Sequence, residues 1–107
     1  MERNKVKVMN IVEKRTGEQL CLCLEGRLDT TTAPELEKRL KEQLTGVKEL
    51  VFDMEKLDYL SSAGLRILLG AQKRMNQQGS MKVVHVNETI MEIFEVTGFV
   101  DVLVLEG

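Results

Sequence analysis

The sequence predicts a single α/β domain, a small mixed β-sheet covered by helices in the order β-β-α-β-α-β-α-β. A chain of 107 residues has about the length of one domain. Short apolar runs typical of strands alternate with segments of helical periodicity, which indicates parallel strands joined by right-handed crossovers. Only the first two runs are joined by a short turn, which predicts an antiparallel hairpin. We therefore expect residues 1–107 to form one folded domain.

The charge balance limits the partners and surroundings of the protein. Its 15 basic and 17 acidic residues give a formal net charge of −2 and are interleaved, so direct binding to nucleic acid is not expected. The opening segment, "MERNKVKV", lacks the apolar core of a signal peptide. No apolar run approaches the ~20 residues of a membrane helix, so we expect a cytoplasmic protein without membrane insertion.

The first two strands are expected at residues 4–13 and 18–25, with "KRTGE" turning the chain between them. Cys21 and Cys23 would lie on one face of the second strand about 6–7 Å apart, a poor geometry for a disulfide. With one histidine in the chain, the pair cannot complete a structural zinc site. We expect small apolar side chains packed in a reducing compartment, and no metal or cofactor.

The first helix is expected within "TTTAPELEKRLKEQLTG". Thr32 and Glu35 have the spacing of a capping box, and Pro34 is tolerated in a first helical turn. The apolar stripe of this helix consists of Leu36, Leu40 and Leu44. Charged residues on its other faces are expected to be solvated.

A short third strand at residues 50–52 is expected to end at Asp53. The second helix is expected at residues 62–78, with Gly79 as a left-handed residue at its C-terminus. "MKVVHV" predicts a fourth strand, "ETIMEIFEVTG" a helix stopped by Gly98, and "VDVLVLE" a last strand.

The stretch "DYLSSAGLRILLGAQ" places two serines where the second helix begins. Ser61 or Ser62 is a good N-cap, whose loss would cost about 1 kcal/mol. A nucleophile elbow needs a glycine two residues before the serine as well as after it, and Leu60 stands at the first position for Ser62. The one histidine, His85, is expected in mid-strand and partly buried, away from the strand ends where α/β sheets build their sites. We therefore expect no catalytic residues and no enzyme activity.

A third interpretation is that one of these serines is modified. A phosphate at a helix start meets unpaired backbone N–H groups and the positive end of the helix dipole, so the fold can accept it. It adds about −1.5 to −2 charge near Asp58, and near Asp29 and Asp53 if those lie at the same end of the sheet. A partner docked there would be repelled.

With these residues in view, the sequence resembles the STAS domains (sulfate transporter and anti-sigma factor antagonist), most closely the free-standing bacterial anti-sigma factor antagonists. The resemblance covers nearly the whole chain. It depends on "LEGRLDTTTAPELEKRL", "LVFDMEKLDYLSSAGLRILL" and "IFEVTGFVDVL", of which the second is the most specific.

The resemblance implies a phosphorylation site two residues before the Gly–Leu of the motif, which is Ser62, with Ser61 as second choice. Many antagonists have an aspartate where this chain has Ser61, and often a glycine where it has Arg66. The loop "LDTTTA" is implied to help form the partner surface, although Asp29 also has the simpler role of shaping the turn. The implied partner-binding residues are Asp29, Thr31, Asp58, Ser61, Ser62, Ala63, Gly64 and Arg66.

The resemblance also implies a partner switch. The unphosphorylated protein would bind an anti-sigma factor that is a serine kinase, freeing the sigma factor. Phosphorylation would end that binding, and a serine phosphatase would restore it. The alternative is a STAS docking subunit of a membrane lipid transporter or a stress-signalling complex. Nucleotide hydrolysis by the chain itself is not expected, because it has no G-x-x-x-x-G-K-[ST] loop.

Overall fold

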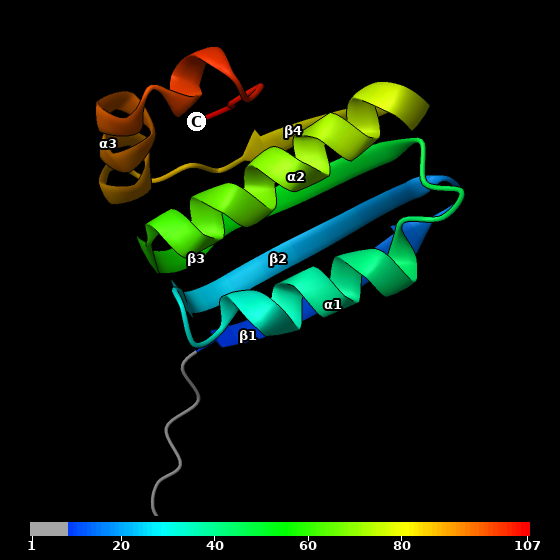
Figure 1. Cartoon of the computed structure of the whole chain (residues 1–107), viewed down its shortest axis with the longest axis horizontal. Helices are drawn as coiled ribbons and strands as arrows, with labels where there is room; N and C mark the ends of the chain where they lie inside the picture. The colour runs from blue at the N-terminus through cyan, green and yellow to red at the C-terminus, as the bar shows by residue number, and fades with distance from the viewer. Residues whose placement is uncertain (1–8) are drawn as a thin grey trace, which may run out of the picture.

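A computed structural model describes residues 9–107 as a four-stranded mixed sheet with helices (Figure 1). The sheet order is β1-β2-β3-β4, with β1 antiparallel to β2 and the other neighbours parallel. The elements are β1 (Met9–Thr16), β2 (Gln19–Leu28), α1 (Ala33–Gln43), β3 (Glu49–Leu60), α2 (Ser62–Gln78), β4 (Ser80–Val84), α3 (Glu88–Thr97) and the 3-10 turn η1 (Phe99–Asp101). The predicted fold class is confirmed. The part of the first predicted strand at residues 4–8 lies outside the described residues.

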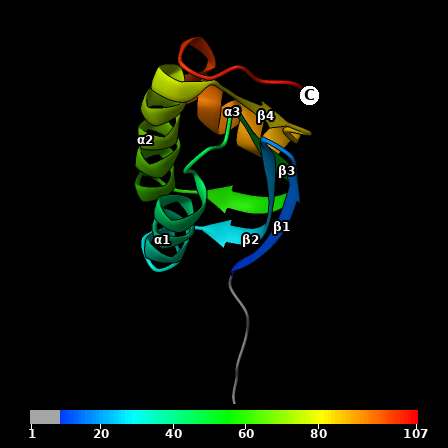
Figure 2. The same cartoon turned by 90° about the vertical axis from the view of Figure 1, so that its right-hand side faces the viewer.

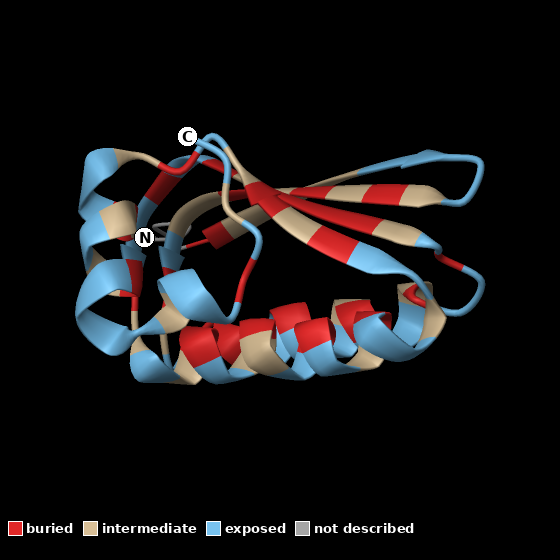
Figure 3. Ribbon diagram, turned by 90° about the horizontal axis from the view of Figure 1, so that it is seen from above, coloured by how far each residue is buried: buried red, intermediate tan, exposed pale blue. Residues whose placement is uncertain are grey.

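Helices α1 and α2 cover one face of the sheet and leave the other face open (Figure 2). Each strand has a buried side and an open side, because neighbouring residues in a strand point to opposite faces of the sheet. In β2, Leu20, Leu22 and Leu24 are fully buried under the helices, whereas Cys21 and Cys23 on the open face are half-buried. Figure 3 shows buried residues concentrated on the sheet side of the long helices.

The third helix, α3, closes one end of the sheet. Asn87 caps it, since its side-chain oxygen accepts a hydrogen bond from Ile90 N at 2.9 Å. The same amide donates to the carbonyl of Leu57 at 2.9 Å, which ties α3 to β3. Gly98 ends the helix, as predicted, and it does so in the left-handed conformation. Within the described part of the chain, no helix is long and apolar enough to cross a membrane.

Two strand predictions are wrong in extent. Strand β3 continues past Asp53 to Leu60, because β2 provides a pairing partner along that whole length. The predicted last strand is a 3-10 turn followed by one parallel bridge between Val83 and Leu105. Val83 N donates to Val104 O at 2.9 Å, and Glu106 N donates to Val83 O at 2.8 Å. With only five residues, β4 offers the returning chain little edge to pair with.

The prediction of a left-handed Gly79 is also wrong. Its φ of 178° is extended backbone that any residue adopts. Glycine is required there for space, because an added Cβ would collide with the carbonyl oxygen of Lys48. Ser80 N donates to that same oxygen at 2.9 Å, so the approach of the two segments starts β4.

Candidate functional site

The carboxyl ends of β2 and β3 lie side by side and carry the residues that the sequence singled out. Leu28 pairs with Leu60 at the end of the parallel ladder, so the loop beginning at Asp29 and the start of α2 emerge together. Ser61 N donates to Leu28 O at 2.9 Å, and Leu65 N donates to Ser61 O at 3.0 Å. The backbone of Ser61 therefore joins the end of the sheet to the first turn of α2.

The two serines lie in different environments. Ser61 occupies the N-cap position, but its side chain makes no capping bond, so the capping interpretation is right in position and wrong in interaction. Its Oγ is buried and finds no hydrogen-bond partner among residues 9–107. Ser62 is the first residue of α2 and is exposed. Of these two serines, Ser62 is therefore the exposed one, whereas the hydroxyl of Ser61 is buried.

Gly64 brings the start of α2 close to the sheet. A Cβ at this buried position would lie 2.6 Å from Leu60 Cδ1 and 2.7 Å from Leu28 Cγ, so the helix could not pack as closely with any larger residue. Gly64 thus holds Ser62 at the ends of β2 and β3.

The loop after β2 is organised by Asp29. Its carboxylate accepts hydrogen bonds from Thr31 N at 3.0 Å and Thr31 Oγ1 at 2.7 Å. The bond from the Thr31 hydroxyl is the main reason that the pKa of Asp29 lies below its ordinary value. Arg27 Nε lies 3.5 Å from the same carboxylate. Asp29 is therefore ionised at neutral pH and shapes the turn that follows β2.

The buried side chain of Thr32 holds this loop together by hydrogen bonds and does not form the predicted capping box. Its hydroxyl donates to Arg27 O at 2.8 Å and accepts from Asp29 N at 2.9 Å. It makes no side-chain bond to the N-terminus of α1. The Thr32 hydroxyl bonds backbone groups of the loop in place of an N–H group of α1, as Ser and Thr side chains often do.

A groove of about 580 Å³ runs between α1 and α2 and reaches the loop and the helix start. Ala63 and Arg66 from the predicted partner surface line it, together with Thr30, Ile67 and Gly70. Asp58 lies apart from this groove, on a hollow shared with Asn87, Glu88 and Thr89. The structure therefore brings Ala63 and Arg66 to the groove between α1 and α2 and places Asp58 on a separate hollow.

Sequence reasoning missed one contact beside the loop. The guanidinium of Arg27 lies 4.3 Å from the centroid of the Tyr59 ring, a cation–π geometry. The two residues are paired across β2 and β3, so their proximity depends on the strand register and had no local signal.

His85 is neither in mid-strand nor buried, so that prediction is wrong. It follows the last residue of β4 with a φ of +55° and is exposed. Its Nδ1 lies 3.1 Å from Asp53 Oδ2. Asp53 is on the open face in the middle of β3, and no hydrogen bond within residues 9–107 links His85 to Ser61 or Ser62.

The prediction that Cys21 and Cys23 share a face of one strand is confirmed, but the face is the open one. Both thiols are free and half-buried outside the main core. Burial, followed by the neighbouring Cys23, raises the pKa of Cys21 to about 11. The Cys21 side chain is therefore a protonated thiol at neutral pH.

Comparison with known proteins agrees with this architecture. The STAS domain family model matches residues 10–106. BtrV of Bordetella bronchiseptica, which is named as an anti-sigma factor antagonist, is 33% identical over 96 residues, covering 88% of this chain and 83% of BtrV. The anti-sigma-B factor antagonist of Staphylococcus aureus is 32% identical over 80 residues, covering 73% of this chain and 74% of that protein.

Solved structures show the same fold. The anti-sigma factor antagonist SpoIIAA in its unphosphorylated form superposes with a TM-score of 0.79 at 17% identity, covering 90% of this chain and 87% of SpoIIAA. The phosphorylated form of the Bacillus cell fate determinant SpoIIAA gives 0.71 at 17% identity, with 90% of each chain covered.

Proposed function

This chain belongs to the STAS domain family, and from that premise we propose that it is an anti-sigma factor antagonist controlled by phosphorylation of Ser62. The observation that carries the first half is the similarity to two antagonists at 33% and 32% identity over most of each chain. In this proposal the protein is a binding partner and a phosphate acceptor, and it performs no catalysis itself.

The exposure of Ser62 at the first residue of α2 supports its role as the acceptor. A phosphate there can accept hydrogen bonds from backbone N–H groups of the first helical turn, and the helix dipole favours its charge. The neighbouring Ser61 is disfavoured as acceptor, because its Oγ is buried and its backbone is bonded at both ends to Leu28 and Leu65. Phosphorylation of Ser62 would leave the fold intact.

The partner is an anti-sigma factor with serine kinase activity, and the docking surface is formed by the loop after β2, the start of α2 and the adjoining groove. Asp29 already places one negative charge in that loop. A phosphate on Ser62 adds about −1.5 to −2 more at neutral pH. Acidic groups of a docked partner would then face a cluster of like charge, and a serine phosphatase would reverse the effect by removing the phosphate.

The size of the effect is adequate for a switch. Weakening a complex from nanomolar to micromolar affinity requires about 4 kcal/mol. Like charges forced together at an interface cost several kcal/mol. A single modification can therefore end the binding without unfolding either protein.

Phosphate transfer tests the proposal directly. The purified chain is incubated with ATP and each candidate anti-sigma kinase from its own organism, and intact mass and peptide mass spectrometry follow. We expect one added phosphate on Ser62, none on Ser62→Ala, and an unchanged yield on the matched control Ser61→Ala. If Ser61→Ala alone abolishes the modification, the acceptor is the wrong serine. If no kinase modifies the protein, regulation by phosphorylation is refuted.

Binding is measured separately, so that docking and modification can be told apart. By calorimetry, unmodified protein and Ser62→Ala should bind the kinase equally, whereas Ser62→Asp should bind at least about tenfold more weakly, a loss of about 1.4 kcal/mol. Equal binding by Ser62→Asp would contradict charge repulsion. Absence of binding to any anti-sigma factor would contradict the antagonist function itself and favour a docking subunit of another assembly.

A further inference from the structure

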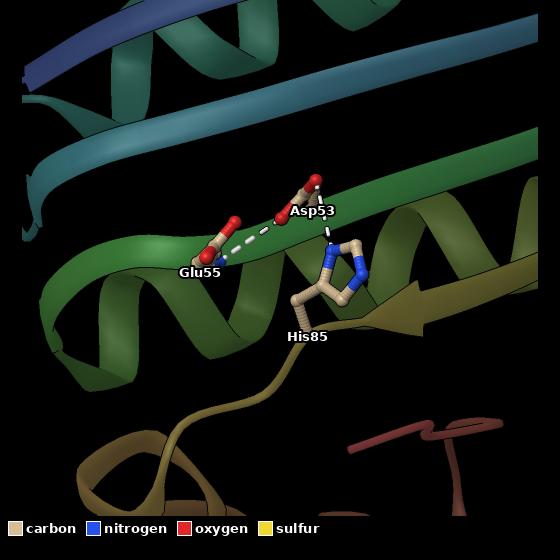
Figure 4. Close-up of side chains that lie close together, drawn as sticks. All are labelled: Asp53, Glu55 and His85. Atoms are coloured by element: carbon tan, nitrogen blue, oxygen red, sulfur yellow. Dashed lines mark hydrogen bonds and ion pairs between the residues drawn. The ribbon is translucent and has the colours of Figure 1, made fainter.

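The open face of the sheet carries three metal-ligating side chains that the proposed function does not use. Asp53 and Glu55 belong to β3, and His85 follows Val84, the residue of β4 that pairs with Asp53. Figure 4 shows the carboxylates and the imidazole turned toward one another in front of the sheet, with α2 behind it. One ligand atom from each of the three lies within 4.8 Å of the others.

Regular strand alternation places Glu55 on the same face as Asp53, because the two residues are two positions apart in β3. Cys23 pairs with Asp53, but Glu25 pairs with Lys56, so β3 carries one more residue than β2 between these pairs. This bulge changes the alternation only after Glu55, so that Glu55 and Lys56 are both exposed and Leu57 is buried. Glu55 N also donates to Asp53 Oδ1 at 3.0 Å, which holds the two residues together.

The spacing suits a tetrahedral ion. Bonds of about 2.0–2.1 Å to zinc place neighbouring ligand atoms about 3.3 Å apart. His85 Nδ1 and Asp53 Oδ2 are 3.1 Å apart, so an ion could replace the proton between them with little movement. Glu55 is exposed, and a rotation that moves its carboxylate by under about 2 Å would complete a third bond.

Within residues 9–107, no lysine or arginine forms an ion pair with Asp53 or Glu55. Asp53 and Glu55 line a hollow of about 210 Å³ on this face together with Cys23, Lys14 and Lys56, and His85 lies beside this hollow and not in its lining. Lys56 is engaged by Glu25, with Nζ 3.9 Å from Oε2. Lys14 is exposed and its charge is screened by solvent. Both cluster carboxylates therefore remain available to an ion.

The geometry points to a zinc-type divalent ion bound by Asp53, Glu55 and His85, with solvent at the fourth position. One imidazole and two carboxylates are typical ligands for zinc, whereas calcium requires six to eight oxygen ligands. The site lies on the face opposite α1 and α2, so its test is independent of Ser62.

Calorimetric titration of zinc into the chain without a histidine tag, in metal-free buffer, tests the site. We expect one ion per chain and a higher melting temperature with zinc than with a chelator. Changes to outer-shell partners weaken metal sites by about 10- to 100-fold, so loss of a ligand in His85→Ala or Asp53→Asn should weaken binding at least about tenfold. The control Asp101→Asn removes an exposed carboxylate outside the cluster and should bind as the unchanged protein does.

The double variant Cys21→Ser with Cys23→Ser tests the other donors on this face. We expect it to keep its zinc affinity. If it loses binding while His85→Ala keeps it, the ion belongs to the thiols and the proposed site is wrong. Absence of any binding at zinc concentrations up to about 100 μM also overturns the proposal.

Discussion

Two glycines in α2 offer a matched test of how the helix start is held. Gly64 lies buried in the first turn, and Gly70 is exposed further along the same helix. Alanine should favour the helix at both positions by up to about 1 kcal/mol. A Cβ at Gly70 meets open space, whereas at Gly64 it lies 2.6 Å from Leu60 Cδ1 and 2.7 Å from Leu28 Cγ.

The steric clash decides whether Gly64→Ala raises or lowers the free energy of unfolding. Leu60 Cδ1 is the end of a flexible side chain and can turn away, but Leu28 Cγ is a branch point near a backbone held in the β2–β3 ladder. Overpacking of this kind costs about 1–3 kcal/mol, more than the helix propensity returns. We expect Gly64→Ala to lower the free energy of unfolding by up to about 2 kcal/mol and Gly70→Ala to raise it by about 0.5–1 kcal/mol.

Urea unfolding followed by far-ultraviolet circular dichroism measures both changes, since the chain has no tryptophan to report by fluorescence. Unchanged m-values would show that stability, and not the compactness of either state, has changed. If both alanine variants are stabilised equally, the close approach of α2 to Leu28 and Leu60 is not what requires glycine, and the reasoning is refuted.

Three further predictions concern the loop and the open face. Thr32→Val should lower the free energy of unfolding in urea by about 1–3 kcal/mol, because Asp29 N and Arg27 O lose a buried hydrogen-bond partner. If the exposed control Thr45→Val lowers it equally, the Thr32 hydroxyl does not hold the loop together. The pKa of Asp29 is lowered in the folded state, so its stabilising contribution is present above the unfolded value of about 3.9 and is lost as the pH falls through the folded value. Asp29→Asn should therefore be less stable than the unchanged protein at pH 7, with the gap narrowing below about pH 4; a constant gap in acid unfolding curves would refute this. Cys21, whose pKa is raised to about 11, should be alkylated by iodoacetamide at pH 8 more slowly than an unstructured cysteine peptide, and equal rates by peptide mass spectrometry would show that the thiol is not held protonated.

Local periodicity correctly predicted the helix bounds that depend only on residues close together in the sequence. The helix expected at residues 62–78 is α2 with the same bounds, and Gly98 ends α3 as predicted. The end of β3 at Leu60 was missed, since Glu55, Lys56 and Asp58 are polar and exposed, and only pairing with β2 keeps them in a strand.

Local sequence likewise predicted only part of the candidate site. The pattern Ser61–Ser62–Ala63–Gly64 determined by itself that a helix begins at a serine and that a small residue follows within one turn. It could not determine that Ser61 Oγ is buried and Ser62 exposed, since that depends on how α2 meets the ends of β2 and β3.

Other contacts were decided only by tertiary structure. The Thr32 side chain bonds the loop and not the helix that follows it, and the Lys48 carbonyl lies where a Cβ of residue 79 would be. His85 Nδ1 lies within hydrogen-bond distance of Asp53. In the last two, residues about 30 positions apart approach within a few ångströms, as neighbouring parallel strands require. Helices and strands follow from consecutive residues, because propensity and periodicity act over one or two turns. The packing of distant segments decides which hydroxyl is buried, which glycine has no room for a Cβ, and which carboxylate contacts the histidine. The chain acquires these contacts only when the core forms.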